Sequence, residues 1–529
     1  MRFTANPSTH PMRIAATVLV AIASSCALLF SSAVAQDDAR YGGTLRVALA
    51  EPIPSLDVHR GITPGIQNVL ANVTETLILF DFGGAHHPGL ASSWEISDDQ
   101  LTYTFQLREG VQFHDGTMMT AEDVKASLER WFAVTPVSWE VASFETIEIL
   151  DDYTIDVHLS ETFTGTLDAL ALGPAAILPK SVIDRMGEEV LTGNDIIGTG
   201  PYRLVDFAPE RTWTLERFDG YHGQFTGDPS FYAGEKNAYV DRIEFTRVAE
   251  AGTRLAGLLA GDFDISDDLS PDDLDLLDSR RGFHANVMDG ALGWYTKLNA
   301  LQGPFADETL RTAVRVGIRP AEIMAGFGDS RLWELNLFPR FHPDSPYNLN
   351  DSVNSEYYYP ENMELARQLV AASSYAGEPI RILGSRDLSG WYVQAIGLLP
   401  MLQEMGLNAE LIITDRPQQM QIALDNSAWE MKTSFSTPIR RAAVLGFHGR
   451  HRDGSQWPWA DAEHQYYESV LWRDLDRREE AITRMIQLEL ERSGQLWFGH
   501  TGLLRGHSDR VQDMPFSDYL HLANTWLAD

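Results

Sequence analysis

The second half of the sequence alternates between helical and strand patterns, and this alternation limits the folds that the chain can adopt. Strands that alternate with helices form parallel sheets with helices on their faces. The pattern therefore predicts an α/β lobe past residue 300. The expected helices are residues 307–318, 360–372 and 395–406, and the expected strands are 380–384 and 407–414.

Strand patterns prevail in the first half of the chain. Leu45, Val47 and Leu49 alternate with Thr44, Arg46 and Ala48, which predicts a strand. Thr120 followed by Asp123 is a capping-box pattern that predicts the start of a helix. Gly261 is expected to end a helix that begins at residue 251. Further strands are predicted at 102–108, 153–159, 202–207, 212–218 and 239–248, and a late helix at 478–492.

Composition and charge exclude several classes of protein. Apolar residues make up 44% of the 529 residues and charged residues 22%, which is too apolar for a disordered chain. The formal net charge of −34 repels nucleic acid and anionic lipid, so neither is an expected partner. The alternative role of this charge is plain solubility.

The N-terminus has the pattern of a secretory signal peptide. Arg2 and Arg13 precede an apolar run of 17 residues, and Ala33-Val34-Ala35 forms an A-x-A cleavage site. We expect cleavage of residues 1–35 and a periplasmic protein. A retained anchor is the alternative, and translation from Met12 would give a signal of more usual length.

Cys26 is the only cysteine, and it lies inside the expected signal peptide. A lipid-modified cysteine normally ends its apolar run, whereas here the residues ALLF continue it. Cleavage after Ala35 leaves a chain without cysteine. Such a chain has no thiol catalysis and no cysteine-ligated metal.

Motifs of catalysis are missing from the sequence. It has no GxSxG elbow, no HExxH helix and no GxxxxGK[ST] loop. His448 and His451 have HxxH spacing, but Arg450 and Arg452 beside them oppose a cation, so we expect a polar loop there. The carboxylate pairs are expected to be solvated. We predict no catalytic residue, no metal and no cofactor.

Residues 194–204, NDIIGTGPYRL, have the look of a phosphate-binding loop. Such a loop follows a strand and opens a helix. Here Pro201 and a strand pattern follow the glycines instead. Gly198 and Gly200 therefore indicate positive φ angles or a close backbone approach at a turn into a strand.

Four segments together resemble the family 5 extracellular solute-binding proteins of ABC importers, the dipeptide-, oligopeptide- and nickel-binding group. Their order and spacing match along essentially the whole chain after the signal peptide, and the second segment is highly specific. The segments are 42–59 (GGTLRVALAEPIPSLDVH), 88–124, 196–207 and 360–377.

The resemblance implies an α/β periplasmic-binding-protein fold of type II. Two lobes are joined by a hinge, the ligand lies between them, and an extra domain is inserted near the N-terminus. The first lobe is expected to hold 36–58, 196–300 and 491–529, the inserted domain 59–195, and the second lobe 301–490. The implied partners are a small solute or peptide and the permease and ATPase of an importer. We expect a monomer.

The expected ligand departs from that of the peptide binders. In those relatives an aspartate in the last third takes the α-amine of the peptide. The corresponding region, 434–451, has no aspartate but has Arg440 and Arg441. Arginine side chains suit carboxylates and phosphates, so one hypothesis is an anionic ligand, either an acidic peptide derivative or another carboxylated or phosphorylated solute. The alternative is that both arginines pair with surface carboxylates.

Further ligand-binding residues follow from position in the resemblance. Arg386 lies where dipeptide binders hold the ligand's carboxylate. Tyr295 lies where the chain crosses towards the second lobe. Trp457 is a further aromatic candidate for the wall of the site, with core packing as the alternative. The complete predicted set is Thr63, Tyr295, Arg386, Trp391, Thr437, Arg440 and Trp459.

Two other functions stay open at the level of sequence. One is a secreted hydrolase with an unrecognised carboxylate or serine site, which would release altered ligand. The other is a periplasmic chaperone or signalling module on the same fold, which would lack a neighbouring permease and ATPase.

Overall fold

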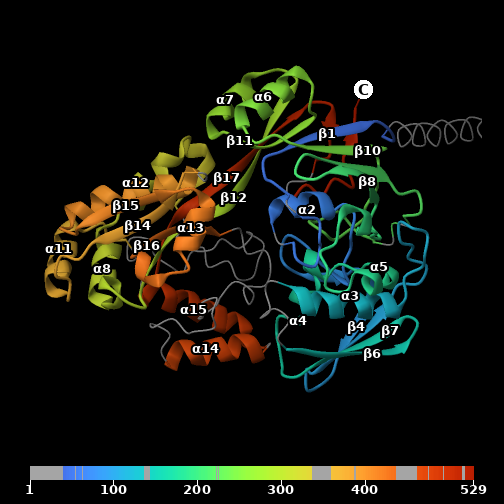
Figure 1. The fold of residues 1–529 in the computed structure, drawn as a ribbon, viewed down its shortest axis with the longest axis horizontal. Helices are drawn as coiled ribbons and strands as arrows, with labels where there is room; N and C mark the ends of the chain where they lie inside the picture. The colour runs from blue at the N-terminus through green and yellow to red at the C-terminus, as the bar shows by residue number, and fades with distance from the viewer. Residues whose placement is uncertain are drawn as a thin grey trace, which may run out of the picture.

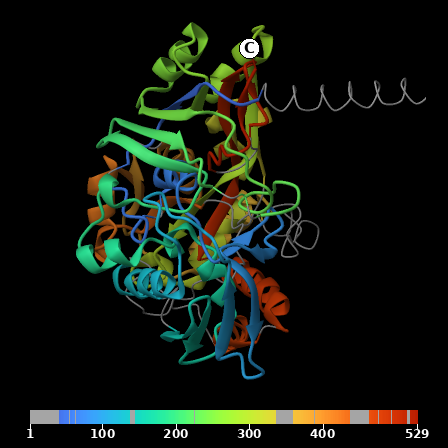
Figure 2. The same cartoon turned by 90° about the vertical axis from the view of Figure 1, so that its right-hand side faces the viewer.

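The computed structural model describes residues 40–53, 55–61, 63–135, 143–221, 223, 225–335, 359–386, 389–436, 462–474, 476–492, 494–514 and 519–528. Two views of the ribbon are drawn in Figure 1 and Figure 2. No helix in these ranges is long and apolar enough to cross a membrane.

One mixed sheet of 11 strands runs through both lobes of the molecule (Figure 1). Its order is β15-β14-β16-β12-β17-β11-β1-β10-β9-β8, and β13 pairs with β17 outside this path. The strands are β1 (Thr44–Leu49), β8 (Tyr202–Ala208), β9 (Thr212–Arg217), β10 (Arg242–Arg247), β11 (Ile265–Leu269), β12 (Phe283–Leu298), β13 (Trp333–Glu334), β14 (Ile380–Ser385), β15 (Ala409–Thr414), β16 (Met431–Ser436) and β17 (Gln495–Ser508).

The first lobe is built around β1, which pairs in parallel with β10 and β11. Leu45, Val47 and Leu49 are fully buried, as the alternation predicts. Ala48 is also buried, because β1 lies between two other strands. Gly261 ends a helix with φ of 81°, a left-handed conformation that glycine adopts without strain. The helices of this lobe are α6 (Ala251–Ala260) and α7 (Leu274–Ser279). Helix α2 (Pro64–Leu70) falls in the range predicted for the inserted domain but packs against the core of β1.

The second lobe has the predicted α/β pattern. Strands β14, β15 and β16 pair in parallel, and helices pack on them. These helices bury their apolar faces, as Ile482 and Met485 of the late helix do. The helices of this lobe are α8 (Glu308–Gly317), α9 (Pro320–Met324), α11 (Met363–Ala372), α12 (Ser389–Glu404), α13 (Arg416–Ile422), α14 (Ala462–Arg473) and α15 (Arg478–Arg492).

Two long antiparallel strands, β12 and β17, connect the lobes. Their pairing runs from Phe283 opposite Ser508 to Lys297 opposite Gln495. The register shifts between Met288 and Leu292 and again after Trp294. Extra residues in one strand of a pair bend the strand locally. The bends lie where β12 leaves the first lobe and begins to pair with β16.

A separate antiparallel sheet forms a third body. Its order is β4-β5-β7-β6, with α3 packed on it. Thr120 and Asp123 complete the predicted capping box at the start of α3. These elements lie within 59–195, the range predicted for an inserted domain, and the exact bounds of all three bodies stay a prediction. The elements are β4 (Ala91–Ile96), β5 (Thr102–Leu107), β6 (Phe144–Asp151), β7 (Thr154–Leu159), α3 (Ala121–Val134), α4 (Thr166–Leu170) and α5 (Lys180–Met186).

Short strands complete the described fold. Two pairs form small sheets outside the larger ones. They are β2 (Ile78–Phe80) with β3 (His86–Pro88), and β18 (Val511–Gln512) with β19 (Trp526–Leu527).

The glycines of 194–204 permit a close backbone approach. The amide of Gly200 donates to the Val73 carbonyl at 3.0 Å, and the amide of Tyr202 donates to Asn72 at 3.1 Å. A Cβ atom on Gly198 would lie 2.0 Å from the Val73 oxygen. Neither glycine has a positive φ. Of the two reasons predicted for these glycines, close approach is the one that the structure shows.

We expect Gly198→Ala to lower the free energy of unfolding by about 1–3 kcal/mol, because the added methyl group overpacks the Val73 carbonyl. Urea unfolding of both proteins measures the change. Gly252→Ala is the matched control, since a Cβ there meets nothing within 4 Å. Equal midpoints for Gly198→Ala and the wild type would contradict the close approach.

Candidate functional site

Two arginines lie at the carboxyl edge of the second lobe's parallel strands. Arg386 directly follows β14, and its amide donates to the Thr414 carbonyl at 3.0 Å. Arg416 is the first residue of α13, whose N-cap Asp415 accepts from the Gln418 amide at 2.8 Å. Ligands of α/β sheets bind outside the carboxyl ends of the strands. Both guanidinium groups therefore belong to the edge where a ligand is expected.

Trp391 adds an aromatic surface to this edge. The Arg416 guanidinium carbon lies 5.9 Å from the centre of the Trp391 ring, within the range of a cation–π contact. Trp391 is only 8% exposed, and its indole nitrogen has no hydrogen-bond partner in the described ranges. A buried indole N–H usually finds an acceptor. Trp391 is thus a mostly buried aromatic support beneath the Arg416 guanidinium.

The first lobe presents its own strand end to the same place. Glu51 follows β1 and accepts from the Gly65 amide at 3.1 Å. Burial and the negative charge of Asp267 raise the pKa of the Glu51 carboxyl, while the Gly65 amide and the positive charge of Arg416 oppose the rise. Glu51 of the first lobe thus lies within electrostatic range of Arg416 of the second lobe. These residues at the strand ends of both lobes make up the candidate site.

Two aspartates of β11 adjoin Glu51. The Asp267 carboxylate accepts from Arg505 Nε at 2.7 Å. Asp268 is exposed to solvent, yet the protein around it and the charge of Asp267 raise the pKa of its carboxyl to about 6, against a weaker effect of Arg254. The first lobe thus contributes a concentration of negative charge.

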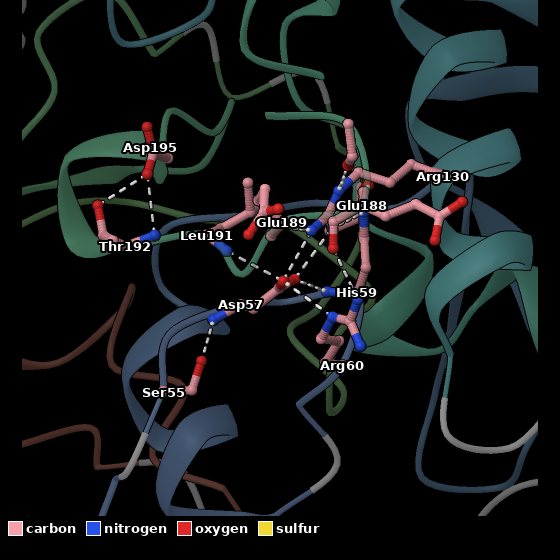
Figure 3. Close-up of polar contacts among 12 residues, drawn as sticks. Ser55, Asp57, His59, Arg60, Arg130, Glu188, Glu189, Leu191, Thr192 and Asp195 are labelled. Carbon is pink, nitrogen blue, oxygen red and sulfur yellow. Dashed lines mark hydrogen bonds and ion pairs between the residues drawn. The ribbon is translucent and has the colours of Figure 1, made fainter. Parts of the chain in front are cut away.

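A buried network holds the chain between β1 and α2 (Figure 3). Arg130 of α3 donates to both oxygens of Asp57, at 3.0 and 2.7 Å, and to His59 Nδ1 at 2.9 Å. Burial lowers the pKa of His59 to about 4, so the ring is neutral at pH 7 and donates from Nε2 to the Ala176 carbonyl. Hydrogen bonds from Arg130 and the Leu191 amide lower the pKa of Asp57 despite its burial.

This network fixes the start of the segment that carries Thr63. Thr63 is the N-cap of α2, and its hydroxyl has no hydrogen-bond partner in the part of the chain that the structure describes. Tyr295 lies on the connecting strand β12, where its ring stacks on Trp497 at 4.4 Å between centres. Thr63 lies two residues before Gly65, whose amide donates to Glu51, and Tyr295 lies on a strand that connects the lobes.

The predicted site residues fall into two groups. Thr63, Tyr295, Arg386 and Trp391 lie around the junction of the lobes, and their role as ligand contacts stays a prediction. Sequence reasoning missed Glu51 and Arg416, although each lies two residues after a predicted strand, a position that marks ligand edges. Asp267 and Asp268 are one of the carboxylate pairs expected to be solvated; Asp268 is exposed, whereas Asp267 is buried and paired with Arg505. The remaining predicted residues lie outside the described ranges; they are Thr437, Arg440, Arg441, His448, His451, Trp457 and Trp459.

The pattern of the bacterial extracellular solute-binding proteins, family 5, matches residues 85–435, more than half of the chain. The chain belongs to this family. The family predicted from the sequence is therefore confirmed. Its relatives are binding proteins of transporters, periplasmic or extracellular.

Named relatives cover the chain to different extents. The Sinorhizobium fredii "Probable peptide ABC transporter periplasmic-binding protein y4tO" is 27% identical over 445 residues, 80% of this chain and 82% of that protein. The glutathione-binding protein GsiB of Escherichia coli K12 is 28% identical over 315 residues. That match covers 58% of this chain and 57% of GsiB.

Solved structures confirm the predicted type II fold. AgaA of A. tumefaciens R10, in complex with agropinic acid, has a TM-score of 0.76 at 22% identity, over 92% of this chain and 99% of AgaA. DppA of Helicobacter pylori, in complex with the peptide STSA, has a TM-score of 0.75 at 19% identity. That match covers 94% of this chain and 100% of DppA.

We expect Asp268→Asn to stabilise the ligand-free protein above pH 6. A carboxyl whose pKa is raised on folding binds its proton more tightly in the folded state, so stability falls as pH rises from about 4 through about 6. Because the side chain is open to solvent, we expect a gain of only about 1 kcal/mol at pH 8. Urea unfolding at pH 4 and pH 8 should show a gain only at pH 8. A gain that is equal at both pH values would contradict the environment described for Asp268.

Proposed function

We propose that this protein is the periplasmic solute-binding component of an ABC importer and that its ligand is a small, anionic, peptide-like solute. The observation that carries the proposal is the position of Arg416. This residue packs over Trp391 in the second lobe and acts electrostatically on Glu51 in the first lobe. A group bound beside it would contact both lobes.

Ligand capture in this proposal is a physical process without chemistry on the ligand. A ligand that contacts both lobes only when they are closed shifts the equilibrium towards closure by its difference in affinity for the two states. The bends in β12 are suited to absorb the change in angle between the lobes. The closed protein then delivers the unmodified solute to a permease and its ATPase.

The charges around the site favour a ligand with carboxylates. Arg386 and Arg416 offer guanidinium donors at the second lobe's edge, and such donors bind carboxylates in pairs of hydrogen bonds. An amino group of the same ligand would find Glu51 and Asp268 on the first lobe. The ligands of two similar proteins agree with this chemistry, since agropinic acid and glutathione both carry carboxylates.

Export and the absence of catalysis belong to the same proposal. Residues 1–35 act as a cleaved signal peptide, and the protein works as a monomer. The hydrolase alternative has no support among the relatives, which are transport binding proteins. No group of three or more potential metal-ligating residues is found in the described ranges. Recovery of unaltered ligand from the denatured protein is the outcome that separates binding from hydrolysis.

We expect Arg416→Ala to weaken binding of anionic peptide-like solutes by about 10- to 100-fold, because a hydrogen bond to a charged group contributes about 1.5–3 kcal/mol. Isothermal titration calorimetry with a panel of dicarboxylates, acidic peptides and neutral tripeptides measures the effect.

Arg367→Ala is the matched control, since Arg367 is an exposed arginine of the same lobe that pairs with Glu404. It should leave every affinity unchanged. Neutral tripeptides that bind more tightly than every anionic solute would overturn the anionic specificity. Equal losses in Arg367→Ala and Arg416→Ala would overturn the placement of the site.

A further inference from the structure

A second contact joins the bodies of the molecule far from the connecting strands. The chain just before and within α4, on the inserted domain, packs against α14 and the start of α15, on the second lobe (Figure 1). The Thr164 amide donates to the Trp472 carbonyl at 3.0 Å, and the Thr164 hydroxyl donates to the Leu471 carbonyl at 2.5 Å.

An ion pair lies at the centre of this contact. Arg478 Nη2 donates to Asp168 Oδ2 at 2.8 Å, and Arg478 Nη1 donates to the Thr164 carbonyl at 3.1 Å. His86 Nε2 lies 2.9 Å from the other oxygen of Asp168. Asp168 and Arg478 are only 4% and 6% exposed. Both charges are therefore withdrawn from water where the two bodies meet.

An aromatic stack and an exposed ion pair surround the central pair. Phe163 stacks on Trp472 with 5.4 Å between ring centres and 19° between planes. At the rim, Arg473 lies 2.6 Å from Glu161, and both of these side chains are about half exposed. The contact thus has a buried core and a solvent-exposed rim, as interfaces between separable bodies do.

The two sides of the contact belong to bodies that change their relative position when the lobes open. The inserted domain is fixed to the first lobe by the buried pairs Asp57–Arg130 and Glu75–Lys236. Helix α15 is fixed to the second lobe, where Arg311 of α8 donates to the Arg492 carbonyl at 3.1 Å. Rotation about β12 and β17 must therefore separate α4 from α14 and α15.

We propose that this contact is a latch that fastens the closed form and separates each time the lobes open. The latch comprises Phe163, Thr164, Asp168, Trp472 and Arg478. The inference rests on the proposed capture of a solute by lobe closure, and it adds a site that holds no ligand but sets how long the closed form lasts.

The chemistry of the latch suits reversible separation. When the two bodies part, water hydrates both charges and replaces most of the attraction between them, so a buried ion pair contributes little net stability. Removal of one partner is different, because the other charge then stays buried and unpaired in the closed form. The ion pair thus favours one geometry of the closed form and still allows the lobes to open.

Hydrogen exchange of the Thr164 amide tests the proposal directly in the ligand-free full-length mature protein. This amide is bonded across the latch to Trp472, whereas the Ala121 amide is bonded within the inserted domain to Asp152 at 2.8 Å. We expect Thr164 to exchange at least about 10-fold faster than Ala121, through opening without unfolding. Arg478→Met should accelerate exchange of the Thr164 amide by about a further 10-fold or more and leave the exchange rate of the Ala121 amide unchanged.

Arg477→Met is the matched control, because Arg477 is the neighbouring arginine, 40% exposed and paired with Glu480 of α15 on the same side of the contact. This substitution should leave the exchange rates of the Thr164 and Ala121 amides unchanged. Identical exchange of Thr164 and Ala121 in every variant would overturn the latch, since the contact would then part only on global unfolding.

If Arg478→Met fails to fold, a cross-link across the contact provides a second test. Residues 36–529 contain no cysteine, so Glu161→Cys with Arg473→Cys places the only two thiols at the exposed rim. A short bis-maleimide between them should slow Thr164 exchange to the Ala121 rate. The same reagent on Lys180→Cys with Asp184→Cys, one turn apart on α5, should have no effect.

Unchanged Thr164 exchange after cross-linking at the rim would also overturn the proposal. The proposed function would fail in a different way, because the protein would then bind no solute. The exchange of the Thr164 amide is measured without ligand and does not depend on that result.

Discussion

The antiparallel pairing of β12 with β17 is the interaction on which the rest of the structure depends. These two strands belong to one continuous sheet that crosses both lobes, so the lobes share a backbone ladder as well as packed side chains. The ladder is irregular at Met288–Leu292, and a bulge concentrates bending at one place. A long pairing with bends at two register shifts lets the lobes change angle without loss of their own hydrogen bonds.

The residues of the proposed solute site and of the proposed latch belong to the bodies that this ladder connects. Parallel strands of each lobe end at the junction, which brings Glu51 from one lobe to Arg416 of the other. The inserted domain moves with the first lobe through Arg130 and Asp57, and it meets the second lobe again at Asp168 and Arg478. The proposed solute site therefore has the ladder at one end and the proposed latch at the other.

The sequence predicts those features whose causes are local. Alternating residues predict β1, and the Thr120–Asp123 capping box predicts the start of α3, because backbone periodicity and caps depend only on near neighbours. The Gly198 turn is predicted for the same reason. The approach of Glu51 to Arg416 was missed, because it arises from the packing of whole lobes. Likewise, nothing in the segment around Asp168 indicates an arginine partner in α15.

The most direct test of the central claim is mass spectrometry of solute that co-purifies with the protein from the native periplasm. We expect one small carboxylate-bearing solute, close to one molecule per chain, released unaltered when the protein is denatured. A protein that releases a chemically altered product, or that carries no solute and binds none from a periplasmic extract, would contradict it.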